Sequence, residues 1–166
     1  MRSVLFICTA NICRSPMAMG LLRAKVLALG EDADWRIESA GTWAEPGQPA
    51  AVNTRLIVAE RGVDLTGHRS RTVTRELVKE FNLALTMESG QKEALRAEFR
   101  EDARRVFLLS EMIGKSYDIV DPVGKSLDEY RWTAHEIRVI LNDGYDRIRT
   151  LAARGRTSGS LNRPYR

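Results

Sequence analysis

The chain alternates between short apolar runs and longer segments in which apolar residues recur every three or four positions. Short runs rich in apolar and β-branched residues are typical of strands buried in a parallel sheet. They occur at residues 3–7, 35–40, 83–87 and 106–109. The other periodic segments predict helices at residues 16–29, 50–61, 74–81, 89–100 and 126–154.

The order of these elements predicts the fold class. Strands that alternate with helices over short connections form a parallel sheet with helices packed on both faces. The sequence contains no internal repeat and no interior linker between domains, although a Gly/Pro-rich loop, GTWAEPGQP, follows the second strand. We therefore expect one α/β domain, doubly wound, with a four-stranded parallel sheet.

The net charge changes this interpretation little. A formal charge of +4 could indicate nucleic-acid binding. However, the last thirteen residues, RGRTSGSLNRPYR, contain four arginines and no acid, so residues 1–153 are formally neutral. The sequence thus predicts no nucleic-acid partner. We expect a domain at residues 1–154 and a basic, disordered tail at residues 155–166.

The cysteine and histidine content bears on location and metal binding. Cys8 and Cys13 are too few for the disulfide framework of a small secreted domain. No apolar run reaches the roughly 18 residues that span a bilayer, and residues 3–7 are too short for a signal-peptide core. We expect a cytoplasmic protein without a membrane partner. His68 and His135 lie far apart in the sequence, and no metal site is predicted.

The segment after the first predicted strand carries the candidate chemistry. It reads CTANICRSP from Cys8 to Pro16, a tight loop of small and polar residues between a strand and a helix. Ligands of open α/β sheets bind at the carboxyl ends of the strands. The N–H groups of such a loop, together with the positive end of the helix, form a cradle for an anion of phosphate size.

Cys8 and Arg14 give this cradle its reactivity. The five residues between them allow one turn, which places the Cys8 sulfur at the floor and the Arg14 guanidinium over the rim. A guanidinium can hold two phosphoryl oxygens at once, and positive surroundings favour the nucleophilic thiolate. Ser15 could donate a hydrogen bond to the sulfur. Asn11 is a residue type that tolerates left-handed backbone.

The run VLFICTANICRSP resembles the phosphate-binding loop of the low-molecular-weight protein tyrosine phosphatase family. Chain length, element order, the SAGT segment at residues 39–42 and a late Asp-Pro pair agree, up to about residue 154. The resemblance implies a cofactor-free hydrolase that takes a phosphorylated protein and releases inorganic phosphate. It implies that Cys8 is the nucleophile and Arg14 the phosphate clamp. It also implies phosphate-binding roles along the loop, for Thr9, Ala10, Asn11, Ile12, Cys13 and Ser15, with Asn11 and Ser15 shaping it.

The reaction also needs an acid, because the leaving group must be protonated as its bond to phosphorus breaks. Asp118 and Asp121 lie in the segment DIVDPVG. By resemblance the acid is the aspartate directly before proline, Asp121, and Asp118 is the second choice. His68, in GHRSR, falls where the family has a histidine that supports the loop, although such a residue taken alone is more typical of a surface turn.

Cys13 admits two interpretations. It could be a small apolar filler without a function. The resemblance suggests instead that it forms a disulfide with oxidised Cys8 and so protects it from irreversible oxidation.

The residues expected around the substrate favour different substrates. Tyrosine-specific relatives commonly have an aromatic residue after Asp-Pro, where this chain has Val123, and Trp43 is a candidate for another wall. Arginine-specific relatives have threonine at the loop position occupied by Ile12. Phosphotyrosine is the expected substrate and phosphoarginine the alternative. An arsenate reductase is disfavoured because no cysteine follows Cys13, and a non-catalytic phosphoprotein-binding module because the nucleophile, clamp and acid are all present. The oligomeric state stays open.

Overall fold

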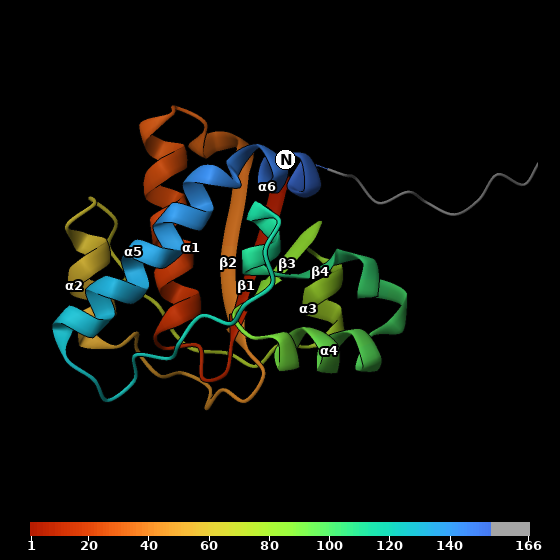
Figure 1. Ribbon diagram of the computed structural model, residues 1–166, viewed down its shortest axis with the longest axis horizontal. Coiled ribbons are helices and arrows are strands. Elements are labelled where there is room, and N and C mark those ends of the chain that lie inside the picture. Colours follow the sequence, from red (N-terminus) through yellow and green to blue (C-terminus); the bar gives the residue numbers. More distant parts are fainter. Residues whose placement is uncertain (154–166) are drawn as a thin grey trace, which may run out of the picture.

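The computed structural model describes residues 1–153. Within them, the strands form a single four-stranded, all-parallel sheet in the order β2-β1-β3-β4 (Figure 1). Their bounds are Arg2–Cys8 for β1, Trp35–Gly41 for β2, Leu83–Thr86 for β3 and Val106–Leu108 for β4. The predicted domain boundary at residue 154 and the predicted disordered tail lie outside the described residues.

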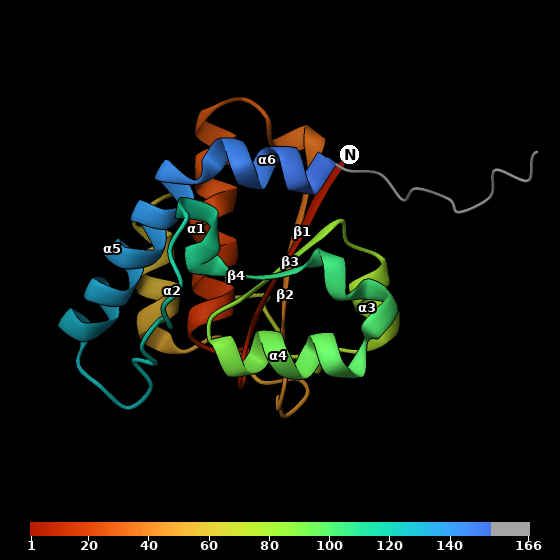
Figure 2. The ribbon, with the colours of Figure 1, turned by 45° about the vertical axis from the view of Figure 1, so that its right-hand side comes forward.

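The helices cover both faces of the sheet, and the doubly wound α/β fold expected from the sequence is confirmed. Figures 1 and 2 show α1, α2 and α5 together on one side and α3 and α4 on the other. The helices span α1 (Arg14–Ala28), α2 (Val52–Ala59), α3 (Arg75–Lys79), α4 (Ser89–Glu98), α5 (Leu127–Asp143) and α6 (Tyr145–Ala153). Three short 3-10 helices, η1 (Asp32–Asp34), η2 (Arg100–Arg105) and η3 (Leu109–Ile113), complete the described part.

The alternation of side chains along β1 explains the two layers. Val4 and Phe6 are buried in the cluster that contains the apolar faces of α1, α5 and α6. Leu5 and Ile7 are buried in a second cluster, with side chains from α3 and α4. Successive residues of a strand point to opposite faces, so a continuous apolar run is what a strand covered on both sides requires.

The predicted long last helix, residues 126–154, was wrong in one respect: it is divided at Gly144 into α5 and α6. A Cβ atom at Gly144 would lie 2.8 Å from the Met112 Cβ and 2.9 Å from the Ile140 carbonyl oxygen. The glycine therefore lets the helical segment approach η3 at close range. The start of α5 matches the expectation, with Ser126 and Glu129 forming a capping box.

The strand order places the functional end of the sheet between β1 and β3. The chain leaves β1 to form β2 on one side and later returns to form β3 on the other, which creates a topological switch point. At this edge the Met87 N–H donates to the Ile7 carbonyl (3.0 Å), and the Ile119 N–H donates to the Met87 carbonyl (2.9 Å). The loop 114–126 is thereby held beside the carboxyl end of β1. No helix of residues 1–153 is long and apolar enough to cross a membrane.

Candidate active site

The loop between β1 and α1 turns tightly at the switch point. Cys8 is the last residue of β1 and Arg14 the first of α1, which leaves residues 9–13 for the turn. Cys13 is the N-cap of α1, but no described side chain caps this end and its first turn contains no acidic residue. The first N–H groups of a helix have no partner within the helix, so the start of α1 can donate to an anion held by the loop.

Asn11 holds the loop in shape. Its φ of 59° is left-handed, as expected for this residue type. Its Nδ2 donates to Ser15 Oγ and Ser39 Oγ (2.9 Å each), and its Oδ1 accepts from the Arg71 N–H (3.0 Å). His68 Nε2 lies 2.8 Å from the Asn11 carbonyl oxygen. Since a carbonyl can only accept, His68 carries its proton on Nε2 when neutral.

The segment after β2 backs the loop closely. The Thr42 N–H donates to the Cys8 carbonyl and the Trp43 N–H to the Thr9 carbonyl, both at 2.9 Å. A Cβ atom at Gly41 would lie 2.4 Å from the Thr9 carbonyl oxygen. This approach of two backbones explains why the SAGT segment has glycine at its third position.

The Cys8 sulfur lies at the base of the loop. Cys8 is 3% exposed, and its Sγ is 3.0 Å from Ser15 Oγ. The Ser15 hydroxyl also lies 3.3 Å from the Ala40 carbonyl and accepts from Asn11. The single hydroxyl proton can go either to the Ala40 carbonyl or to the sulfur, and a thiolate, which can only accept and lies closer, would attract it more strongly.

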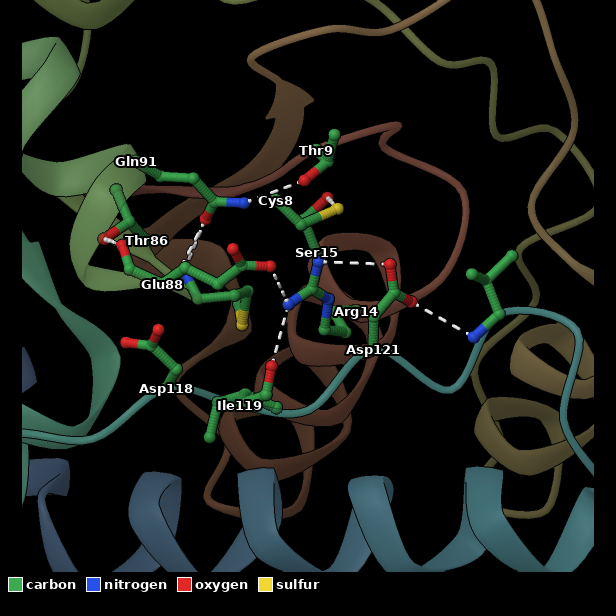
Figure 3. A network of polar contacts seen from close by, with 12 residues as sticks. Cys8, Thr9, Arg14, Ser15, Thr86, Glu88, Gln91, Asp118, Ile119 and Asp121 are labelled. Atoms are coloured by element: carbon green, nitrogen blue, oxygen red, sulfur yellow. Dashed lines mark hydrogen bonds and ion pairs between the residues drawn. The ribbon is translucent and has the colours of Figure 1, made fainter.

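Arg14 connects the loop to the two other segments at this edge (Figure 3). Its Nη1 donates to Glu88 Oε1 (2.6 Å) and to the Ile119 carbonyl (2.7 Å), and its Nη2 donates to Asp121 Oδ2 (3.2 Å). Arg14 is only 1% exposed, because acceptors from the start of α4 and from the loop 114–126 surround its guanidinium. Its buried Nε has no hydrogen-bond partner among residues 1–153.

The two candidate acids occupy different places. Asp121 lies against Arg14, its side chain is 39% exposed, and its Oδ1 accepts from the Val123 N–H (3.1 Å). Asp118 instead accepts from the Ser89 N–H (2.8 Å) at the start of α4. The structure thus brings the aspartate before proline to the loop and uses the other to hold α4.

Two residues at the same edge were missed by the sequence-based reasoning. Glu88 pairs with Arg14. Gln91 accepts from the Met87 and Glu88 N–H groups (3.1 Å each) and donates to Thr9 Oγ1 (3.1 Å). The available signal was the position of Glu88 directly after the third strand, because the carboxyl ends of parallel strands meet at one edge.

Cys13 faces away from solvent and contacts Tyr130 of α5. It is 3% exposed, and its Sγ lies 3.2 Å from the Tyr130 hydroxyl oxygen. Burial raises the pKa of the Cys13 thiol, and the hydrogen bond with Tyr130 only partly opposes this. Burial and the contact with Cys13 likewise raise the pKa of Tyr130. Cys13 is therefore a protonated thiol near neutral pH, and both cysteines are free.

His68 is half-buried behind the loop. Burial lowers the pKa of its imidazole, and the hydrogen bond to the Asn11 carbonyl opposes that effect in part. The ring is accordingly neutral near pH 7 and acts as a donor to the loop backbone. No group of three or more His, Cys, Asp or Glu side chains within residues 1–153 is placed to hold a metal ion.

The residues expected to contact the substrate differ in burial. Ile12 is partly buried and packs against the larger apolar cluster, while its carbonyl accepts from the Ala51 N–H (2.8 Å). Val123 is 53% exposed and Trp43 85% exposed. Ala10 is half-buried in the loop.

Residues 3–150 match the model of the low molecular weight phosphotyrosine protein phosphatase family. The chain belongs to this family. Its members are cysteine-based hydrolases, so the low-molecular-weight phosphatase described here takes phosphorylated protein as substrate and releases phosphate.

Known members of the family resemble about nine-tenths of the chain. A low molecular weight protein tyrosine phosphatase from T. tengcongensis has a solved structure with a TM-score of 0.82 and 36% identity, covering 89% of this chain and 99% of that one. A probable low molecular weight protein-tyrosine-phosphatase, EpsP, from Ralstonia nicotianae is 33% identical over 90% of this chain and 98% of its own. A protein-arginine-phosphatase from Geobacillus stearothermophilus is 32% identical over 89% of this chain and 96% of its own.

Proposed function

We propose that this phosphatase hydrolyses phosphotyrosine in proteins through a phosphocysteine at Cys8. The observation that carries the proposal is the meeting of three groups at one edge of the sheet: the Cys8 sulfur, the uncapped start of α1 and the Arg14–Asp121 pair. The buried Nε of Arg14, unpartnered within residues 1–153, is a donor that a phosphoryl oxygen would satisfy.

The first step transfers the phosphoryl group. The Cys8 thiolate attacks phosphorus, the P–O bond to the tyrosyl oxygen breaks, and Asp121 gives its proton to that oxygen. Loop N–H groups and Arg14 stabilise the charge on the three equatorial oxygens. Ser15 donates to the Cys8 sulfur, which stabilises the thiolate before attack and as the leaving group in the second step.

The second step releases phosphate. Asp121, now a carboxylate, takes a proton from a water molecule, and the oxygen of that water attacks the phosphorus of the phosphocysteine. The S–P bond breaks, inorganic phosphate leaves and the Cys8 thiolate returns. The partial exposure of Asp121 fits both tasks, since the leaving group and the water must each reach it.

Tyrosine is favoured over arginine by the polar groups near the loop. A phosphoarginine guanidinium needs acceptors when it is desolvated, and Glu88, which lies at this edge, is already 2.6 Å from Arg14. Ile12 gives no acceptor from its side chain. Val123 removes one aromatic stacking surface, which costs about 0.5–1.5 kcal/mol, less than the desolvation of a charged group.

Arginine phosphatase activity is the second candidate. It is supported by the relative from Geobacillus stearothermophilus, which matches the chain as well as the tyrosine-phosphatase relatives do. Val123, which stands where tyrosine-specific relatives commonly have an aromatic residue, also favours arginine phosphatase activity.

Turnover of a phosphotyrosine peptide and a phosphoarginine peptide of the same flanking sequence separates the two. We expect a higher kcat/KM for phosphotyrosine, with Cys8→Ser inactive on both. Ile12→Thr should shift the ratio toward phosphoarginine, and Val123→Tyr should lower the KM for aryl phosphates several-fold. Faster turnover of phosphoarginine by the unmodified protein would make arginine the substrate class. Activity retained in Cys8→Ser would overturn the phosphocysteine.

We also propose that the protein works in the cytoplasm and without a nucleic-acid or membrane partner. Support comes from the two free cysteines and from the balanced charge of residues 1–153. Fractionation of the native host with an antibody against the chain tests the location.

A further inference from the structure

Side chains of α1, α2 and α5 line a groove. These three helices lie on the side of the sheet opposite α3 and α4 (Figure 1). The groove consists of two open cavities of about 420 Å³ and 210 Å³. Both are lined by Leu21, Glu60, Arg61 and Arg138, so the two cavities adjoin. The groove runs beside the C-terminal half of α1, whereas the phosphate loop precedes the N-terminal end of that helix. We call it the α1/α2/α5 groove.

The floor of the groove is apolar. Leu21 and Leu141 are buried at the base of the larger cavity, and Ile57 at the base of the smaller. Ala24 and Ala28 of α1 line the larger cavity as well. Small side chains on a helix leave space above the neighbouring helices, and each cavity has room for apolar side chains of a ligand.

The rim of the groove carries unneutralised positive charge. Arg61 and Arg138 line both cavities, and neither makes an ion pair or a side-chain hydrogen bond with any residue of 1–153. The acid of the groove, Glu60, is already paired with Arg131 (3.3 Å). Lys25 donates to Asn142 Oδ1 (3.0 Å), so its charge is also not neutralised.

This local excess does not follow from the overall charge. Residues 1–153 contain equal numbers of basic and acidic side chains. Arginines elsewhere in this range, such as Arg36, Arg71 and Arg105, are paired with nearby carboxylates, whereas Arg61 and Arg138 meet at one groove without such a partner. Arginines without a carboxylate partner at the edge of an apolar cavity are typical of sites that recognise an acidic partner.

We propose that the α1/α2/α5 groove binds an acidic peptide segment of a partner protein, with apolar side chains on both sides of the acid. The two shared arginines stand between the cavities and take the carboxylate, while each cavity takes an apolar side chain. A compact anion would contact the arginines but leave both apolar cavities unused. This docking site is separate from the phosphatase site and does not depend on which phosphoresidue is hydrolysed.

A 12-residue random peptide library displayed on phage, selected against the full chain, tests the proposal. We expect enrichment of segments with one or two acidic residues flanked by leucine-like residues. In fluorescence anisotropy, Arg61→Glu/Arg138→Glu should weaken binding of a selected, labelled peptide by about tenfold or more. Ala24→Phe, which fills the larger cavity, should weaken it without a change of charge. Turnover of p-nitrophenyl phosphate should be the same in all variants.

The matched control is Arg100→Glu/Arg104→Glu. These two arginines of η2 are exposed and unpaired within residues 1–153, and they lie on the α3/α4 side. We expect this control to bind the peptide like the unmodified chain. Equal weakening by both double variants would reduce the effect to net charge and overturn the proposal.

Three other outcomes would also overturn it. They are an absence of enriched acidic peptides, displacement of the peptide by vanadate at the active site, and unchanged affinity in Ala24→Phe. Sedimentation that shows dimers of the unmodified chain but monomers of Arg61→Glu/Arg138→Glu would assign the groove to a second copy instead.

Discussion

At the scale of single residues, Asp121 differs from Asp118 by its position against Arg14. Asp121→Asn removes the proton donor, so we expect turnover of alkyl or weakly acidic phenyl phosphates to fall by about 10² to 10⁴. Esters whose leaving group needs little protonation should be affected much less. A leaving-group series measures this. Equal losses across the series would remove Asp121 from the acid role, and Asp118→Asn is the matched control.

Cys13 offers a second prediction at this scale. Peroxide converts a reactive Cys8 thiolate to a sulfenic acid, which condenses with the Cys13 thiol to form a disulfide and water. We expect activity lost to mild peroxide to return with dithiothreitol in the unmodified protein and to return less completely in Cys13→Ser. Mass spectrometry of the oxidised protein should find the Cys8–Cys13 bond. Its absence would leave Cys13 as a buried residue held by Tyr130.

His68 predicts a pH dependence of stability. Its pKa is lowered from 6.5 in the folded state, so below pH 6.5 the unfolded chain binds a proton that the folded chain excludes. The free energy of unfolding should fall with decreasing pH, by at most about 1.4 kcal/mol per pH unit, until the folded pKa is passed.

Urea unfolding between pH 5.5 and 7.5 measures this slope. His68→Gln keeps an N–H donor for the Asn11 carbonyl without a titratable ring. The difference in free energy of unfolding between the unmodified protein and His68→Gln should therefore narrow as the pH falls. The exposed His135 supplies the control variant, His135→Gln. A constant difference over this range would contradict the effect of His68.

At the scale of elements, the break between α5 and α6 is held by close packing. Gly144→Ala would place a methyl group 2.8 Å from the Met112 Cβ, and overpacking of this kind costs about 1–3 kcal/mol. The control, Gly90→Ala in α4, meets nothing within 4 Å and should stabilise by up to about 1 kcal/mol. Thermal and urea unfolding compare the two. A neutral Gly144→Ala would show that η3 moves freely.

The elements also show what local sequence can predict. Strands and helices were found where apolar periodicity was strong, as in β1 and α4. The break at Gly144 was missed because a single glycine is tolerated in helices and its reason, contact with Met112, lies over 30 positions away in the chain. The acceptors that bury Arg14 were missed for the same reason, since they come from residues 88, 119 and 121, far along the chain.

At the scale of the molecule, the sheet and its covered faces followed from the pattern alone, because each face must bury its apolar side chains. The phosphate loop was likewise visible, since nucleophile, loop and clamp occupy one continuous segment. The partner of the clamp, Glu88, and the groove between α1, α2 and α5 were not. Both are assembled from segments that meet only after folding, so the spacing of residues along the chain cannot predict them.

The central position of β1 also has a consequence for synthesis of the chain. The ribosome makes the nucleophile strand first, but β3, its neighbour in the sheet, begins only at Leu83. The acceptors of Arg14 follow later still, up to Asp121. A nascent chain that ends before residue 121 therefore has its cysteine and phosphate loop but lacks the proposed acid, Asp121. With Asp121 as the proposed acid, catalytic competence arrives only with the last third of the chain, well after Cys8 has been synthesised.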